Sequence, residues 1–275
     1  MSSRADDRRG EGGGGRPSAV LDFLSDPPRQ IATLREREHR PWPLPRGQWV
    51  MGQTWRDLLF AHWRVDPGSL RRHVPEPLTL DVRDGAAWIA VTPFVVTGYR
   101  PVATPPMPYL STFREINVRT YVTRAGKPGI FFFSLDADNR LAVAGARRFY
   151  RLPYFLARAS ARRDGGTVTY RSERRDPRGH EAVFRGAYRP AAPIRPAAPG
   201  SLEAFLCERY RLWVVDEGRA KSADIHHPPW PLQQAEAEID LNTMFPPDLP
   251  PPDGEPLLHF AGRQDVLVWR LTGDD

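Results

Sequence analysis

From Val50 onward the apolar positions of the chain take the pattern of β-strands. Residues 50–65 form the longest such run, rich in the aromatic and branched side chains that favour the pleated surface of a sheet. Turn sequences with glycine, at 126–129 and 164–166, separate later runs. The further strands that we predict cover residues 78–83, 86–98, 112–124, 130–136, 167–173, 182–189, 212–216, 233–240 and 264–271.

A few helices are predicted between these strands. Asp66 followed by Pro67 indicates a short helix, because Asp caps helix starts and proline is favoured at the first helical position. Two more helices are predicted over 139–150 and 201–210, the second with Ser201 as its N-cap. Many strands, few helices and no regular strand–helix alternation predict an α+β fold, with a β-rich, curled or barrel-like sheet.

The composition divides the chain into three segments. Residues 1–18 are rich in Gly and Arg and carry too few apolar side chains to offset the entropy of ordering, so we expect disorder there. Residues 19–49 form an N-terminal arm, in which a short helical pattern is broken at Pro27-Pro28. Residues 50–271 are expected to form one domain.

Cysteine content and hydropathy indicate a soluble, cytoplasmic protein. Cys207 is the only cysteine, which excludes an internal disulfide or a Cys-rich zinc site and suits a reducing compartment. No run of about 18 apolar residues exists to span a membrane. The charged, Gly-rich start also lacks the apolar core of a signal peptide.

The basic charge does not indicate a nucleic-acid partner. The formal net charge is +6, but the arginines are interleaved with Asp and Glu along the whole chain and form no basic run. We therefore predict no binding of nucleic acid.

The seven histidines do not form a recognisable metal motif. His226 and His227 are adjacent, and adjacent side chains on a strand point to opposite faces, so only one of them can face a given site with His259. No HExxH sequence is present. We predict no metal and no cofactor, and a structural or pocket-lining role for His226 beside Trp230.

Two segments resemble parts of acetoacetate decarboxylase. They are DPGSLRRHVPEPLTLDV at 66–82 and LAVAGARRFYRLPYFLA at 141–157. Three further runs, at 113–122, 201–213 and 225–239, are similar to runs in the YqjF-like proteins, a bacterial branch of the same superfamily. The resemblance covers about residues 48–271 and implies an acetoacetate decarboxylase-like fold.

The lysine that defines decarboxylase chemistry is missing from this pattern. In that family a proline precedes two lysines, one of which forms a Schiff base, whereas Pro153 is followed by Tyr154 and Phe155. The chain has only two lysines, Lys127 in a Gly-Lys-Pro-Gly turn and Lys221 in a polar stretch. Because a Schiff base requires a lysine with a lowered pKa, we predict that this protein forms none with a ketone.

The resemblance also implies a set of site residues. It places Arg56 and Glu115 in an apolar cavity, with Trp88 where the family has a second glutamate. An Arg–Glu pair can bind a carboxylate and transfer a proton, or the two charges can simply neutralise each other. Tyr154 can donate to a carbonyl oxygen or only pack. The candidate catalytic residues are Arg56, Glu115 and Tyr154, and the candidate pocket residues are Trp88, Phe155 and His226.

Two functions fit this site. The first is an enzyme for a small keto or enol acid that works by acid–base chemistry, as a lyase, hydratase or isomerase. The second is a non-catalytic protein that binds a small acid in the same cavity. A further titratable group there, such as His62, His226 or Glu208, would favour the enzyme. The expected partner is a small carboxylic or keto acid, and a homo-oligomer is compatible with the sequence.

Overall fold

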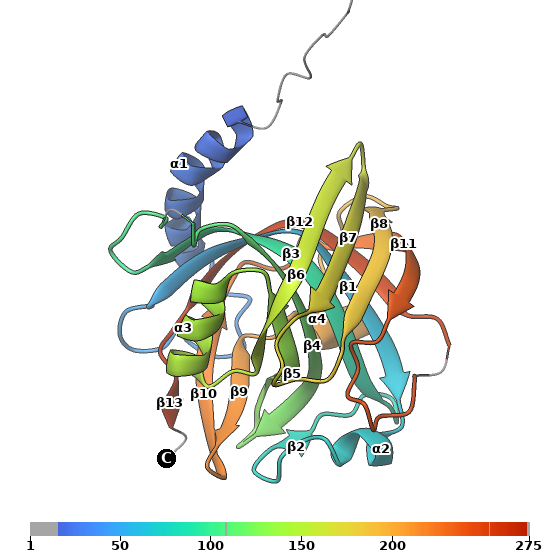
Figure 1. The fold of residues 1–275 in the computed structure, drawn as a ribbon. Helices are drawn as coiled ribbons and strands as arrows, with labels where there is room; N and C mark the ends of the chain where they lie inside the picture. Colours follow the sequence, from blue (N-terminus) through green and yellow to red (C-terminus); the bar gives the residue numbers. More distant parts are fainter. Residues whose placement is uncertain (1–15, 108, 253, 274–275) are drawn as a thin grey trace, which may run out of the picture.

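The structure, a computed structural model, describes residues 16–107, 109–252 and 254–273, and their strands form one strongly curled sheet (Figure 1). The helices are α1 Arg16–Ala32, α2 Pro67–Arg71, α3 Arg140–Tyr150 and α4 Leu202–Cys207, with a 3-10 turn η1 at Thr33–Arg35. The strands are β1 Met51–Val65, β2 Thr79–Leu80, β3 Ala87–Pro101, β4 Phe113–Arg124, β5 Lys127–Ala137, β6 Tyr154–Asp164, β7 Thr167–Arg174, β8 Val183–Pro190, β9 Arg211–Asp216, β10 Arg219–His226, β11 Gln233–Asn242, β12 Leu257–Val268 and β13 Thr272–Gly273.

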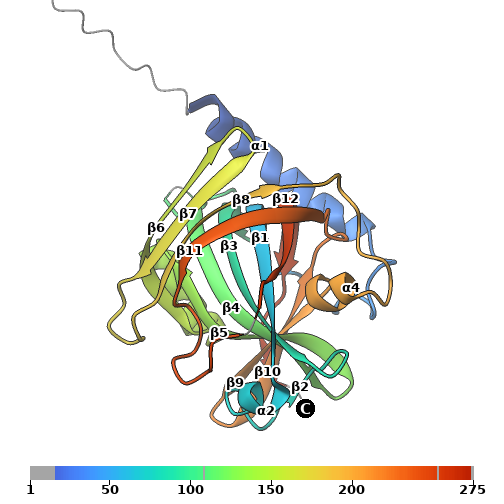
Figure 2. The same ribbon diagram turned by 90° about the vertical axis from the view of Figure 1, so that its right-hand side faces the viewer.

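Part of the sheet closes into a ring. Strand β5 pairs with both β4 and β9, and β10 pairs with both β9 and β12, so the path through β1, β3 and β4 returns to its start. Strands β6, β7, β8 and β11 leave the ring at β5 and rejoin it at β12, and they form a second curved wall (Figure 2). The predicted β-rich, curled α+β fold is confirmed.

Alternate side chains of β1 pack into two different hydrophobic cores. Leu58 and Phe60 belong to the core inside the ring, whereas Leu59 and Ala61 belong to the core that Tyr170 and its neighbours in the second wall complete. Successive side chains of a strand point to opposite faces, so an almost continuous apolar run serves both cores. This explains why the run at 50–65 is not a simple alternation of apolar and polar residues.

The predicted helix starts are confirmed by their caps. The Asp66 carboxylate accepts a hydrogen bond from the Ser69 backbone N–H at 2.7 Å. Asn139 caps α3 and Ser201 caps α4 in the same way. Helix α4 ends at Cys207 and is shorter than predicted. None of the described helices is long and apolar enough to cross a bilayer.

The sequence pattern missed strands β6 and β10 and the two-residue β13, and it misplaced β12. Strand β6 is largely polar and exposed beyond its first residues, so it shows no apolar period. Strand β10 buries polar side chains such as Asp224, which binds Arg211 at 2.8 Å and Arg40 at 3.1 Å. Strand β12 begins at 257, earlier than the predicted 264–271, and ends at 268.

The N-terminal arm differs from its prediction. The helical segment is not broken at Pro27-Pro28, because α1 continues through both prolines to Ala32. The prediction of disorder for residues 1–18 falls mainly on residues outside the described ones, although residues 16–18 begin α1. The domain boundaries stay predictions. Contacts with the sheet explain why the helix tolerates two prolines in its interior.

Two buried polar side chains hold α1 against the sheet. The carboxylate of Asp26 lies 3.1 Å from Arg56 and 3.0 Å from Arg263. Gln30 donates a hydrogen bond to the carbonyl oxygen of Gly98 at 3.0 Å and accepts one from Arg100 at 2.9 Å. Both Asp26 and Gln30 are completely buried, so these bonds replace all of their contacts with water.

We expect Gly98→Ala to weaken the docking of α1. Gly98 has φ +58°, and an added Cβ would lie 2.6 Å from Cβ of Asp26. Gly85→Ala is the matched control, because its φ is +74° but no atom lies within 4 Å of the added Cβ. Alanine is strained at the positive φ of either position. Gly98→Ala should therefore lose about 1 to 3 kcal/mol more stability than Gly85→Ala, because only its Cβ overlaps with Asp26. Urea unfolding of both variants measures the difference, and equal losses would contradict this account of docking.

Candidate active site

A cavity of about 280 Å³ lies inside the ring, between the sheet and helix α3. This volume is at the small end of the range for ligand pockets, which is roughly 300–1,000 Å³. Its wall is mostly apolar and includes Trp55, Leu58, Phe94, Phe113, Phe132 and Leu152. A few polar side chains interrupt this wall, and they are concentrated on β4.

Strand β4 presents three polar side chains to the cavity at every second position. Glu115, Asn117 and Arg119 line it, while Ile116 and Val118 between them belong to the other core. The period of two residues in a strand accounts for this separation. This segment, which is mixed polar and apolar in sequence, therefore contributes polar side chains to the cavity and apolar side chains to the core on its other face.

Glu115 and Tyr154 form a hydrogen-bonded pair at this wall. The Tyr154 hydroxyl donates to Oε2 of Glu115 at 2.8 Å. Burial raises the pKa of Glu115 from 4.5 to about 8, and the charge of Asp136 adds to the rise while the Tyr154 hydrogen bond opposes it. Burial also raises the pKa of Tyr154 well above its usual value, so the phenol stays protonated. Glu115 is thus mainly neutral at neutral pH and can gain or lose a proton near pH 8.

Arg119 brings a buried positive charge to the same cavity. It is 6% exposed, and its guanidinium carbon lies 5.1 Å from the centre of the Phe60 ring. Within the described part of the chain, it forms no ion pair with a carboxylate, and its Nε has no hydrogen-bond partner. Asn117 Oδ1 and Thr92 Oγ1, at the same wall, also lack partners there. Because buried charges are normally paired, Arg119 is suited to an anionic ligand.

Of the predicted catalytic residues, Glu115 and Tyr154 meet in the cavity and Arg56 does not. The expectation that Arg56 shares a cavity with Glu115 is wrong: Gln53 and Trp55 face the cavity, so Arg56 lies on the opposite face of β1. There it binds Asp26 of α1 at 3.1 Å. The catalytic roles of Glu115 and Tyr154 stay predictions.

The three predicted pocket residues do not line the cavity either. Phe155 follows Tyr154 on β6 and points the other way, with its ring centre 4.1 Å from the guanidinium carbon of Arg174. His226 bonds to the carbonyl oxygen of Thr33 at 2.9 Å, and Trp88 is buried in the core of the ring. In each case the side chain has another packing partner, which sequence reasoning could not see.

The other titratable groups considered from sequence lie away from the cavity wall. His62 bonds to the hydroxyl of Tyr121 at 2.7 Å, and Glu208 accepts from the backbone N–H of Trp230 at 2.9 Å. Lys221 binds Asp216 at 2.6 Å, and Lys127 is exposed at the start of β5. Among the described residues, no group of three or more His, Cys, Asp or Glu side chains is arranged to hold a metal ion.

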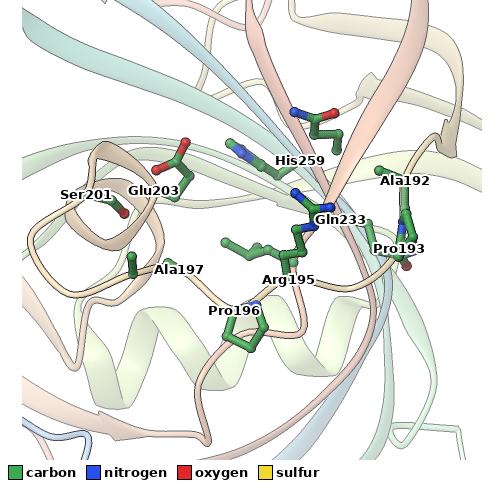
Figure 3. Close-up of a pocket in the computed structure, with 12 residues that line it drawn as sticks. Ala192, Pro193, Arg195, Pro196, Ala197, Ser201, Glu203, Gln233 and His259 are labelled. Atoms are coloured by element: carbon green, nitrogen blue, oxygen red, sulfur yellow. Dashed lines mark hydrogen bonds between the residues drawn. The ribbon is translucent and has the colours of Figure 1, made fainter.

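A second hollow of about 290 Å³ lies between α4, β12 and the segment 192–198 (Figure 3). Glu203 and His259 lie on one side of it and Arg195 on another. Arg195 is exposed, and the other five lining positions in that segment are Pro or Ala. The cavity of Glu115 is the better candidate for catalysis, because it combines burial with a shifted carboxyl pKa and an arginine, Arg119, that has no carboxylate partner among the described residues.

Arg119 is the residue that sequence reasoning missed. It lies in FREINVRTYV, four positions after Glu115, so the two-residue period of a strand would have placed both on one face. The signal was therefore present in the sequence.

Solved structures with a similar fold include acetoacetate decarboxylase-like enzymes. The acetoacetate decarboxylase from Legionella pneumophila has a TM-score of 0.57 and 12% identity, over 87% of this chain and 94% of that one. The enduracididine biosynthesis enzyme MppR complexed with pyruvate has a TM-score of 0.58 and 12% identity, over 86% and 93% of the two chains. This chain therefore has the acetoacetate decarboxylase-like fold.

The sequence comparisons identify the family. The chain matches the family DUF2071, described as "Uncharacterized conserved protein", over residues 52–265. It is 49% identical to "Uncharacterized protein YqjF" of Bacillus subtilis over 229 residues, which cover 83% of this chain and 94% of that protein. The chain belongs to the DUF2071 family, and the predicted YqjF-like relationship is confirmed.

Proposed function

We propose that the protein is an acid–base enzyme for a small keto or enol acid, with the chemistry of a lyase, hydratase or isomerase and without a Schiff base. One observation carries the proposal: a carboxyl with a pKa near 8 and an arginine that has no carboxylate partner in the described part of the chain face one cavity from the same strand. These are Glu115 and Arg119. The arginine suits the substrate carboxylate, and the carboxyl suits proton transfer.

The first chemical step would be enolisation. Ionised Glu115 takes a proton from the carbon beside the keto group, and the electrons of that C–H bond form the double bond of an enolate. The Thr92 hydroxyl, whose buried oxygen has no hydrogen-bond partner among the described residues, can donate a hydrogen bond to the charged enolate oxygen. If the proton on Glu115 is first replaced by a deuteron from solvent, transfer of that deuteron to the same carbon completes the exchange. Transfer to another carbon gives isomerisation. A pKa of about 8 keeps both forms of Glu115 accessible.

Catalysed hydrogen–deuterium exchange tests this proposal without knowledge of the natural substrate. We suggest four methyl keto acids in D₂O, followed by proton NMR: pyruvate, 4-oxopentanoate, 5-oxohexanoate and 6-oxoheptanoate. Pyruvate is included because one structural neighbour is described in complex with it. At least one of these acids should exchange the protons beside its keto group faster with the protein than without it.

Substitution at Glu115 should remove this catalysis. Glu115→Gln keeps an acceptor for Tyr154 but cannot take a proton, so exchange should fall by about 10² or more. Glu203→Gln, in the hollow of Figure 3, is the matched control and should exchange like the wild type. If the wild type binds these acids but exchanges none of them, the protein is a binder and the enzyme proposal fails. Equal loss in both variants would also contradict it.

A further inference from the structure

The polar groups of the cavity are spread along β4 rather than gathered at one point. Glu115, Asn117 and Arg119 occupy every second position of the strand. At about 3.3 Å per residue, the backbones of Glu115 and Arg119 are separated by roughly 13 Å. Side chains of a strand project nearly perpendicular to the sheet, so most of this separation persists inside the cavity.

The cavity has an opening beside helix α3, whereas both ends of this row are buried. Leu141 and Phe149 of α3 both line the cavity, and they are 65% and 70% exposed, so the cavity opens beside this helix. At one end of the row, Glu115 is 5% exposed and accepts a hydrogen bond from Tyr154. Arg119 is 6% exposed and lies at the far end, beside Phe60.

The middle of the row offers hydrogen bonds but no charge. Thr92 Oγ1 and Asn117 Oδ1 are buried there and have no hydrogen-bond partner among the described residues. The opposite walls are apolar, with Leu58, Phe132 and Leu135 among the side chains that line them. A ligand that reaches from Glu115 to Arg119 must therefore have an apolar chain between its two polar ends.

We infer that the substrate is an elongated keto acid, in which several carbon–carbon bonds separate the carboxylate from the carbon that Glu115 deprotonates. This inference rests on the proposed function and names its substrate class. A contact of about 3 Å at each end leaves roughly 7 Å for the ligand to span. With bonds of about 1.5 Å in a zigzag chain, this corresponds to roughly five bonds. Pyruvate is too short to reach both residues, whereas 5-oxohexanoate and 6-oxoheptanoate are long enough.

The four keto acids of the exchange experiment test this length, with binding measured separately by isothermal titration calorimetry. We expect 5-oxohexanoate or 6-oxoheptanoate to bind and exchange at least about tenfold better than pyruvate, because each additional buried methylene contributes about fourfold to affinity. The neutral ketone 2-hexanone has the same carbon chain as 5-oxohexanoate without the carboxylate. It should bind about tenfold or more weakly, since it cannot pair with Arg119.

The Arg119→Met variant tests whether the preference for long keto acids depends on pairing of their carboxylate with Arg119. The variant should reduce the affinity for 5-oxohexanoate to that for 2-hexanone, and should leave the affinity for 2-hexanone unchanged. Tightest binding and fastest exchange with pyruvate would overturn the inference while leaving the enzyme proposal intact. A preference for the long acids in binding, with no exchange, would support the inference about length and refute the proposed enzyme. An Arg119→Met variant that keeps the preference for 5-oxohexanoate over 2-hexanone would also overturn the inference.

Discussion

Glu115→Gln is expected to make the protein more stable by about 4 kcal/mol at pH 8, while it removes proton transfer. The folded protein holds this carboxyl in a buried, mostly apolar site, where ionisation is unfavourable. Glutamine has nearly the same shape, carries no ionisable group and can still accept the hydrogen bond from Tyr154. A residue that reduces stability in this way is typical of a functional site.

The pH dependence of this effect has a definite sign. The pKa of Glu115 is near 4.5 in the unfolded chain and about 8 in the folded protein. Between these values the folded state keeps a proton that the unfolded state has lost, so the contribution of Glu115 to stability falls as the pH rises through this window. The gain from Glu115→Gln should therefore be absent near pH 4 and largest above about pH 8.

Urea unfolding of the wild type and Glu115→Gln, at several pH values, measures this difference. Glu238→Gln on the exposed side of β11 is the control, and its effect should be within about 0.5 kcal/mol at every pH. A variant that is less stable than the wild type at pH 8 would show that Glu115 is ionised and stabilising in the folded protein.

Arg174→Met is expected to destabilise the protein by about 3 to 5 kcal/mol. The side chains of Arg174 and Asp136 are 1% and 0% exposed, and two hydrogen bonds of 2.7 Å join the guanidinium to both carboxylate oxygens. Removing the arginine leaves the carboxylate of Asp136 buried without a counterion, next to the region of Glu115. The loss is measured by urea or thermal unfolding.

Two controls separate the burial of the pair from its charge. The double variant Asp136→Leu with Arg174→Met removes both charges, so it should be more stable than Arg174→Met alone. Arg189→Met breaks the pair with Glu236, in which both side chains are 59% exposed, and it should change stability by less than about 1 kcal/mol. Similar losses for Arg174→Met and Arg189→Met would contradict the importance of burial.

Features that depend on local chemistry could be predicted from the sequence. Asp66, Asn139 and Ser201 cap helices at the predicted positions, because a side-chain oxygen that accepts from the first turn acts within three residues. The apolar run at 50–65 is a strand, because its aromatic and branched side chains pack on both faces. The resemblance to the decarboxylases also placed Glu115 and Tyr154, which meet in the cavity.

Features that depend on distant partners could not be predicted. Arg56 was assigned to the cavity, but its side chain projects from the other face of β1, where Asp26 of α1 meets it. Pro27 and Pro28 lie inside α1, because Asp26 and Gln30 anchor this helix to strands far along the chain. No local pattern shows that such a partner exists, so the resemblance alone could not show that Arg56 projects from the other face of β1.

The ionisation of Glu115 itself is the most direct test of the proposed site. Infrared difference spectra between the wild type and Glu115→Gln, recorded along a pH titration, isolate the signal of this one carboxyl group. The structure predicts a protonated carboxylic acid at neutral pH that ionises with a pKa of about 8. A carboxylate that is already ionised at pH 6 would contradict the burial of this group and its role in proton transfer.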